Sequence, residues 1–356
     1  MTLQHCSIED FVNKSEYLGL PDRGITLYPN QLQVLRLLYL ETKANSECHR
    51  FDSSNLPKQW QEAFDKFSIN HTVGFSNESG IMKRYRLPVT EFGLICGRRC
   101  GKDLMLAIIA LYEAYRLGID DVGVKLAKSP LSIVVVCPTS AQVKVFKNQL
   151  IDLINGSKLF TSGFVYPLAI DSNDIALCFS NTESDLTVKI SIRSCQDSFI
   201  GISTVSLLFN EAGAYGEIVN KIYAHMLPSL NTYTDVTGVR LGKFVVMSSG
   251  KSWFLWDFAR NIKKLPCRMV LRAATWEINP CYSEEELKQQ NTQINDFDQE
   301  YGGAIIEPVD TTEPVTIRLR TQIVESLKRR ARERSYKEDR DVAYTDVIRE
   351  ILDSHI

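Results

Sequence analysis

Cys96-Gly-Arg-Arg-Cys-Gly-Lys-Asp103 carries the strongest fold signal in this 356-residue sequence. It follows a short apolar run at residues 92–96 that is typical of a strand, and residues 103–117 after it are apolar on nearly all sides, as in a buried helix. A strand, a basic turn with glycines and a helix, in this order, predict a phosphate-binding loop, whose usual pattern is G-x-x-x-x-G-K-S/T. An ordinary basic turn without a ligand is the alternative interpretation.

The residues of this loop have separate expected roles. Backbone N–H groups of such loops, and of the helix N-terminus that follows, point at phosphate oxygens. We expect Lys102 to reach the β- and γ-phosphates, and Gly101 to let the backbone turn closely around them. The expected ATP-binding residues of the loop are Gly97, Arg98, Arg99, Cys100, Gly101, Lys102 and Asp103.

A second stretch, Val-Ser-Leu-Leu-Phe-Asn-Glu at residues 205–211, supplies the other half of the expected site. An apolar strand that ends in acidic residues is where such ATPases hold Mg²⁺ and orient the attacking water. Glu211 stands at the position of the water-activating base, and Asn210 stands where an aspartate normally coordinates the metal.

Two positions of the loop depart from the usual pattern. Cys96 replaces the first glycine, and Asp103 replaces the hydroxyl residue that binds magnesium. Since the loop then has the carboxylate and the strand has the neutral amide of Asn210, the net ligand charge is unchanged. We hypothesise that Asp103 and Asn210 have exchanged roles around one Mg²⁺; a slow or inactive degenerate site is the alternative.

The two loop arginines are candidates for an arginine finger, a cation that stabilises the charge developing on the γ-phosphate. We favour Arg98 for this role, so that the expected catalytic residues are Glu211, Arg98 and Lys102. Arg99 would then pair with an acidic neighbour or contact DNA.

Outside these motifs, strand-like runs alternate with helical ones, which predicts an α/β fold. The runs at 131–137, 174–179, 186–192, 205–209 and 243–247 predict strands, and residues 141–154 predict a helix. Residues 205–209 are nearly all apolar, as in a central parallel strand. The expected fold is a three-layer P-loop NTPase with a mostly parallel sheet of the additional-strand type and a small C-terminal β-α-α appendage.

Four segments are expected along the chain. Residues 1–90 form a polar lead-in with a helix around 32–40, and residues 91–265 form the ATPase core. Residues 266–310 form a linker subdomain with a strand and a helix from 283 to about 298. Residues 311–356 form the appendage.

Composition excludes several classes of protein. The formal net charge is −2, so nucleic acid must be bound by local patches rather than a global basic field. No apolar run approaches the ~20 residues of a membrane span, and the polar N-terminus lacks a secretory signal pattern. The nine cysteines and five histidines are dispersed, so we expect reduced thiols and no zinc site.

Together these motifs resemble the ATPase domain of tailed-phage terminase large subunits over about residues 20–305. Further matching stretches are Tyr28-Pro-Asn-Gln31, Val134-Val-Val-Cys-Pro-Thr139 with Gln142, residues 196–203, Met247-Ser-Ser-Gly250, Ala274-Thr-Trp-Glu-Ile-Asn-Pro280 and Phe297-Asp-Gln-Glu-Tyr-Gly302. The resemblance implies that Gln31 contacts adenine and that Ser248 and Ser249 couple the γ-phosphate to motion.

The same resemblance implies the cofactors and partners. ATP and Mg²⁺ are the expected cofactors, and double-stranded DNA, a portal protein and a procapsid are the expected partners, with a terminase small subunit and a separate nuclease chain as further candidates. The protein would form a homo-oligomeric ring in the host cytoplasm, at the procapsid portal. Only 54 residues follow Gly302, too few for the family's nuclease domain, so we expect no DNA cleavage.

The last segment resembles a ribbon-helix-helix DNA-binding module. Residues 315–320 alternate apolar and polar side chains, and two amphipathic helical stretches follow. In such a module two chains pair their strands in the major groove. The expected DNA-contacting residues are Thr316, Arg318 and Arg320, and the module would make the protein a dimer. A solvated amphipathic tail that packs on the ATPase is the alternative.

Three functions follow from the sequence. The leading one is an ATP-hydrolysing DNA-packaging motor. A helicase-like DNA-remodelling ATPase is the second, although no second motor lobe with its arginines is evident. The third is a non-catalytic or weakly catalytic DNA-binding protein that acts through its C-terminal module.

Overall fold

The computed structural model describes residues 6–39, 89–119, 131–171, 173–180, 185–195, 202–234, 240–250, 252–260, 268–291, 296–304 and 329. The chain divides into two compact units, Met1–Pro308 and Val309–Ile356. The expected C-terminal module, with Thr316, Arg318 and Arg320, lies outside the described residues.

Eight strands among the described residues form a single sheet in the order β3-β4-β5-β2-β6-β7-β1-β8. The strands are β1 (Glu91–Cys96), β2 (Leu131–Cys137), β3 (Val165–Ile170), β4 (Asp174–Ser180), β5 (Asp185–Ser194), β6 (Ser206–Asn210), β7 (Phe244–Ser248) and β8 (Arg268–Ala273). All neighbours from β5 to β8 pair in parallel, and β4 pairs antiparallel with β3 and β5. Because β7 stands between β1 and β6, the sheet is of the additional-strand type.

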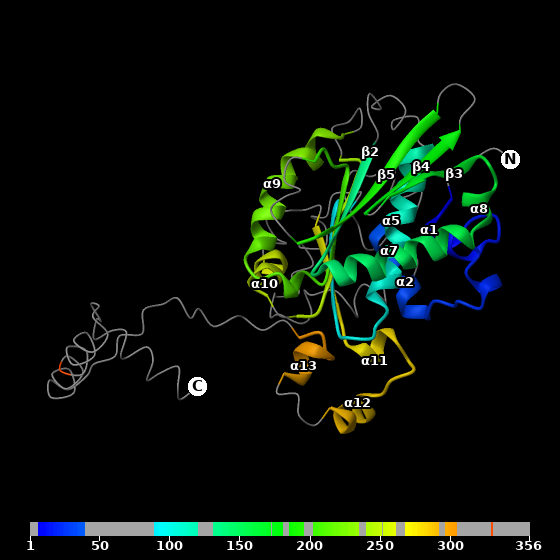
Figure 1. Cartoon of the computed structure of the whole chain (residues 1–356). Helices are drawn as coiled ribbons and strands as arrows, with labels where there is room; N and C mark the ends of the chain where they lie inside the picture. The colour runs from blue at the N-terminus through cyan, green and yellow to red at the C-terminus, as the bar shows by residue number, and fades with distance from the viewer. Residues whose placement is uncertain are drawn as a thin grey trace, which may run out of the picture. The chain divides into compact units, whose positions relative to one another are not determined.

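Helices cover both faces of this sheet (Figure 1). On one face lie α5 (Lys102–Ile119) and α7 (Ser140–Asn155), with α1 (Ile8–Asn13), α2 (Pro29–Tyr39) and α8 (Lys158–Thr161) outside or beside them. On the other face lie α9 (Ile218–Thr232) and α10 (Trp253–Arg260). The short elements η1 (Pro21–Arg23), η6 (Ala212–Ala214), α11 (Thr275–Ile278), α12 (Glu284–Gln290) and α13 (Phe297–Glu300) complete the described part. The predicted three-layer α/β fold is confirmed.

The burial of α5 explains why its sequence is apolar almost all round. The helix lies against β5, β6 and β2 on its inner side and against α7, α1 and α2 on its outer sides. Its one buried acid, Glu113, is fully buried and accepts hydrogen bonds from Tyr39 Oη at 3.0 Å and Ser206 Oγ at 2.8 Å. Arg116 Nη1 forms an ion pair with Glu113 Oε1 at 2.7 Å. Among the described residues, no helix is both long and apolar enough to cross a membrane.

The structure corrects two expectations about the region after residue 265. The stretch 283–298 is not one helix: α12 ends at Gln290, where Asn291 caps it, and α13 begins only at Phe297. The strand β8, which we assigned to a linker subdomain, pairs with β1 at the edge of the core sheet. Its pairing with β1 brings the chain from Thr275 to Tyr301 next to the loop that follows β1.

Candidate nucleotide-binding site

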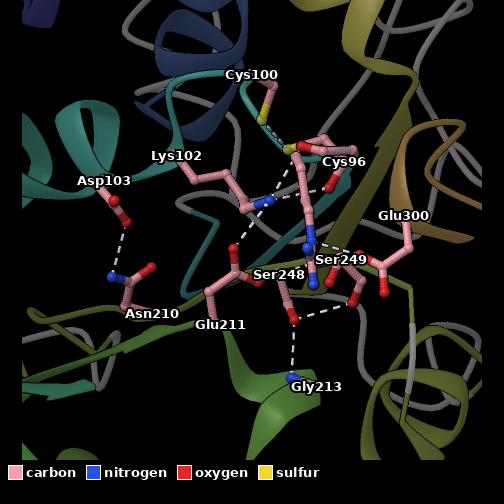
Figure 2. Close-up of polar contacts among 12 residues, drawn as sticks. Cys96, Cys100, Lys102, Asp103, Asn210, Glu211, Gly213, Ser248, Ser249 and Glu300 are labelled. Carbon is pink, nitrogen blue, oxygen red and sulfur yellow. Dashed lines mark hydrogen bonds and ion pairs between the residues drawn. The ribbon is translucent and has the colours of Figure 1, made fainter. Parts of the chain in front are cut away.

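Three parallel strands end at the same edge of the sheet and bring the predicted motifs together. The order β6-β7-β1 places Asn210 and Glu211, then Ser248 and Ser249, next to the loop 97–101. Ligand sites of open α/β sheets form at the carboxyl ends of the strands. Figure 2 shows Lys102 pointing toward Glu211 and Asp103 pointing toward Asn210, with Ser248 and Ser249 near Glu211.

Two glycines of the loop are required by close neighbours. A Cβ atom on Gly97 would lie 2.2 Å from both Thr275 Oγ1 and the Tyr301 carbonyl oxygen. Gly101 has φ +84°, and a Cβ there would lie 2.4 Å from Gln31 Nε2. Both distances are shorter than any real contact, so neither position accepts a side chain without a shift of its neighbours.

The residues after β8 hold the loop from outside. The Gly97 N–H donates to the Ala273 carbonyl, and the Arg98 N–H donates to the Glu300 carbonyl at 2.6 Å. Thr275 Oγ1 donates to the Arg98 carbonyl at 2.7 Å, and Asn279 Nδ2 donates to the Arg99 carbonyl at 2.8 Å. Sequence reasoning assigned no role to Thr275, Asn279 or Glu300. Their only signal was their place in the matching stretches 274–280 and 297–302.

Lys102 is the buried cation at the centre of the site. Its Nζ donates to the carbonyls of Cys96 at 3.2 Å and Gly97 at 3.0 Å, and lies 3.1 Å from Glu211 Oε1. Burial by itself would lower its pKa, but the Cys96 and Cys100 sulfurs and the Glu211 carboxylate outweigh burial and raise the pKa above its usual value. The lysine is therefore charged across the neutral pH range.

Glu211 connects the loop lysine to the end of β7. It has a left-handed backbone, with φ 55°, and its N–H donates to the Met247 carbonyl at 2.7 Å. Its Oε1 faces Lys102, while its Oε2 accepts the Ser249 N–H at 3.2 Å. Ser248 Oγ accepts the Gly213 N–H at 2.8 Å and donates to the Ser249 carbonyl. The predicted base and the predicted coupling serines thus form one hydrogen-bonded chain.

Asp103 and Asn210, the two residues hypothesised to share a metal ion, are in direct contact. Asn210 Nδ2 donates to Asp103 Oδ1 at 2.8 Å (Figure 2). Asn210 is buried, and its Oδ1 has no hydrogen-bond partner among the described residues. Cys137 lies beside the pair: burial and then Asp103 raise its pKa to about 12, against a hydrogen bond with Asn210. This thiol is therefore protonated and adds no charge to the site.

The oxygens of this pair fit Mg²⁺. Magnesium prefers hard oxygen ligands and is usually held by one or two carboxylates together with substrate phosphates and water. Asp103 supplies the carboxylate, and the orphaned Asn210 Oδ1 supplies a buried oxygen that otherwise lacks a partner. No group of three or more His, Cys, Asp or Glu side chains arranged for a metal occurs in the described ranges.

The two loop arginines have different surroundings from those we expected. Arg98, the favoured arginine finger, pairs through Nε with Glu300 Oε2 at 2.5 Å, although its side chain is 60% exposed. Arg99 has φ 65° and lies over the Tyr282 ring at 5.6 Å from its centroid. Arg98 must therefore leave Glu300 before it can contact a γ-phosphate.

Gln31 lies against the loop, but its amide is occupied by backbone. Its Nε2 donates to the Cys100 carbonyl at 2.8 Å, and its Oε1 accepts the Tyr28 N–H at 2.9 Å. The side chain is buried. In this structure the Gln31 amide binds the backbone of the loop and is not free to contact an adenine ring.

Cys96 and Cys100 are in contact at the two ends of the loop. Their Sγ atoms are 2.6 Å apart, and both residues are fully buried and carry free thiols. This pairing is not predictable from the sequence, because the spacing C-x-x-x-C matches no common redox or metal motif.

A match to a family model agrees with the fold. A family model described as the N-terminal P-loop domain of the uncharacterized protein MJ0330 matches residues 4–300. Among solved structures, the large terminase ATPase domain of Thermus phage P74-26 is 14% identical, with a TM-score of 0.47 over 70% of this chain and 98% of that one.

Two further solved structures are similar. The large terminase of HK97 bacteriophage is 15% identical, with a TM-score of 0.42 over 61% of this chain and 47% of that one. A large terminase from a thermophilic bacteriophage, in complex with ADP, is 12% identical, with a TM-score of 0.46 over 79% of this chain and 54% of that one. No curated protein matches the chain.

Proposed function

This chain belongs to the family described as the N-terminal P-loop domain of the uncharacterized protein MJ0330, and on that premise we propose that it is a Mg²⁺-dependent ATPase. The observation that carries the proposal is the pairing of the loop lysine with the strand-end acid, Lys102 Nζ to Glu211 Oε1 at 3.1 Å. The contact between Asp103 and Asn210 lies beside it. A phosphate-binding cation, a candidate base and a candidate metal-binding pair thus occupy one edge of the sheet.

The chain's own residues would divide the work of hydrolysis. N–H groups at the start of α5 and the Lys102 ammonium would bind the phosphates, with Gly101 allowing their close approach. Asp103 and Asn210 would hold Mg²⁺, which neutralises charge on the phosphates when it is bound. Glu211 would orient the attacking water and accept its proton, and Arg98 would add positive charge near the γ-phosphate.

Nucleotide binding would have to break the ion pair between Lys102 and Glu211. Lys102 is held by two carbonyls and by Glu211, so a phosphate must replace Glu211 as its partner. Glu211 would then be released to bind water. Because Glu211 accepts the Ser249 N–H, its movement would also shift the chain at the end of β7. This exchange gives the predicted coupling role of Ser248 and Ser249 a physical basis.

We further propose that ATP hydrolysis moves double-stranded DNA, as in a packaging motor. The support is the resemblance of six separate stretches, in order, to terminase large subunits, together with the chain of contacts from Lys102 through Glu211 to Ser249. The portal, the procapsid, the oligomeric ring and DNA binding by residues 311–356 belong to the same proposal.

The test is ATP hydrolysis by the full chain, with and without double-stranded DNA. We expect DNA-stimulated turnover that Lys102→Ala abolishes and that the control Lys144→Ala, an exposed position on α7, leaves intact. Turnover without stimulation would support the ATPase but contradict the motor. Absence of turnover alongside intact DNA binding would contradict both and favour the non-catalytic DNA-binding function.

A further inference from the structure

The phosphate-binding loop is bracketed by two thiols that touch. Cys96 is the last residue of β1, and Cys100 lies two residues before α5 begins at Lys102. Their sulfurs are in contact, 2.6 Å apart. A small rotation of either side chain would bring them to the distance of a disulfide bond. The intervening Gly97, Arg98 and Arg99 form a tight turn, with Arg99 at φ 65°.

We propose that Cys96 and Cys100 form a reversible disulfide when the protein meets a peroxide, and that this disulfide closes the loop to ATP. The second half of this inference rests on the proposed nucleotide-binding function, whereas the first half does not. Arg98 and Arg99, between the two thiols, are exposed, so a molecule as small as hydrogen peroxide can approach the loop from solvent.

The surroundings distinguish the two thiols. Burial raises the pKa of Cys96 well above its usual value. Burial also acts to raise the pKa of Cys100, but the hydrogen bond from Cys96, the Lys102 ammonium and the Lys102 backbone N–H together lower it. Cys100 is therefore the thiol that is more readily ionised, and thiolates are the species that react.

The reaction balances with peroxide as the only co-reactant. The Cys100 thiolate attacks one peroxide oxygen, the O–O bond breaks, and the products are a Cys100 sulfenic acid and hydroxide, which becomes water with the proton that the thiol released. The Cys96 sulfur then attacks the Cys100 sulfur. The S–S bond forms, the S–O bond breaks, and the hydroxyl leaves as a second water with the Cys96 proton. Two thiols are oxidised by two electrons, and one peroxide is reduced.

Closing this bond would hold the loop in a shape that opposes phosphate binding. The Lys102 backbone N–H, a donor at the start of α5, lies close enough to the Cys100 sulfur to help lower the pKa of that thiol. A phosphate must take over such donors at the helix N-terminus. With the sulfur tied to Cys96, it cannot move aside to leave this donor to a phosphate.

The thiol pair has a clear signature by mass spectrometry. Trypsin cuts after Arg86, Arg98, Arg99 and Lys102, so the two cysteines fall on separate peptides, 87–98 and 100–102. The full-length protein is treated with hydrogen peroxide, free thiols are blocked with an alkylating agent under denaturing conditions, and the digest is searched for the linked pair. Binding of a fluorescent ATP analogue is measured on the same samples.

We expect the linked peptides to accumulate in step with at least a tenfold loss of ATP-analogue affinity, and dithiothreitol to reverse both. In Cys96→Ala and Cys100→Ala the ratio of treated to untreated affinity should stay near one. The control Cys281→Ser, which removes an exposed cysteine, should respond to peroxide like the unmodified protein.

Two results would overturn the proposal separately. If peroxide oxidises Cys281 but never links peptides 87–98 and 100–102, the thiol pair is not a disulfide site. If the link forms while affinity for the ATP analogue is unchanged, the disulfide does not close the loop. A reduced protein that never binds the analogue would instead refute the proposed nucleotide site, whereas the mass spectrum would still report on the thiols.

Discussion

Two residues at the candidate site have a backbone conformation that their side chains disfavour. Arg99 and Glu211 are the non-glycine residues with positive φ among those described, at 65° and 55°. Such residues cost of order 1–3 kcal/mol each and are concentrated at functional sites. The strain at Glu211 is offset by its N–H bond to Met247 and by its contacts with Lys102 and Ser249. Its backbone therefore aims the carboxylate at the loop lysine instead of continuing β6.

Glu211→Gln tests this residue as the base. The amide has nearly the same shape and still accepts a hydrogen bond, but it cannot take a proton from water. We expect turnover to fall about 10²–10⁴-fold, which is the usual contribution of a general base, while ATP-analogue affinity stays within a few-fold. Glu217→Gln, at an exposed carboxylate close in sequence, is the control and should retain full turnover. If Glu211→Gln turned over ATP as fast as the unmodified protein, Glu211 would not be the base.

The exchange of roles between Asp103 and Asn210 predicts a specific rescue. Asp103→Thr alone leaves the pair with no carboxylate, and Asn210→Asp alone places two carboxylates at hydrogen-bond distance, so each should reduce Mg²⁺-dependent turnover. The double variant restores the usual hydroxyl and carboxylate, and should exceed the worse single variant at least tenfold. Titrating turnover against Mg²⁺ measures this directly. A double variant no better than the worse single variant contradicts the exchange.

At the scale of elements, the phosphate-binding loop is supported by chain that follows β8. The pairing of β8 with β1 brings α11 and α13 to the loop, where Thr275, Asn279 and Glu300 bind its backbone. These contacts join residues 177 to 202 positions apart in sequence. The shape of the loop therefore depends on the chain that follows β8 as well as on the loop itself. A substitution in the chain after β8 should change the affinity for nucleotide.

Thr275→Val tests this support. Valine has the same shape as threonine but cannot donate to the Arg98 carbonyl, 2.7 Å from the hydroxyl, or the Tyr301 carbonyl, 3.1 Å away. We expect the free energy of unfolding to fall by about 1–2 kcal/mol, since a buried acceptor loses its partner. ATP-analogue affinity should weaken about three- to tenfold. Thr232→Val, on the exposed side of α9, should change neither quantity.

For the whole molecule, the division into Met1–Pro308 and Val309–Ile356 separates two kinds of expected function. Every predicted residue of the nucleotide site lies in the first unit. The expected DNA-contacting residues Thr316, Arg318 and Arg320 lie in the second. Hydrolysis and the binding of DNA by the C-terminal module should therefore be separable.

A chain ending at Pro308 tests this separation. We expect it to unfold cooperatively and to keep DNA-independent ATP turnover within about twofold of the full chain, because the sheet and its helices lie within the first unit. Its affinity for double-stranded DNA should fall at least tenfold in a fluorescence anisotropy titration. Full DNA affinity in the shortened chain would place the DNA-binding surface in the ATPase unit instead.

The central strands and the loop are predictable from the amino-acid pattern alone. The strand β2 has the predicted bounds, and β1, β6 and β7 are within one residue of theirs, because strands buried on both faces need continuous apolar runs. The bounds of α5 and α7 also differ by only one or two residues from those predicted. The missed helix α9 carries a usable signal, since Val219, Ile222, Met226 and Leu230 recur at helical spacing and are buried. The edge strand β3 carries no usable sequence signal, because it contains Pro167 and half of its residues are exposed.

The partner that each site residue takes depends on the three-dimensional packing of the chain. Sequence spacing indicates that Lys102, Asp103, Asn210 and Glu211 share a site, because strand ends of a parallel sheet meet at one edge. It cannot indicate that Gln31 binds the Cys100 carbonyl, that Arg98 pairs with Glu300, or that Cys96 touches Cys100. Periodicity is a local property of the chain and specifies elements. The choice of a hydrogen-bond or ion-pair partner depends instead on sub-ångström placement between segments that become neighbours only after the sheet has formed.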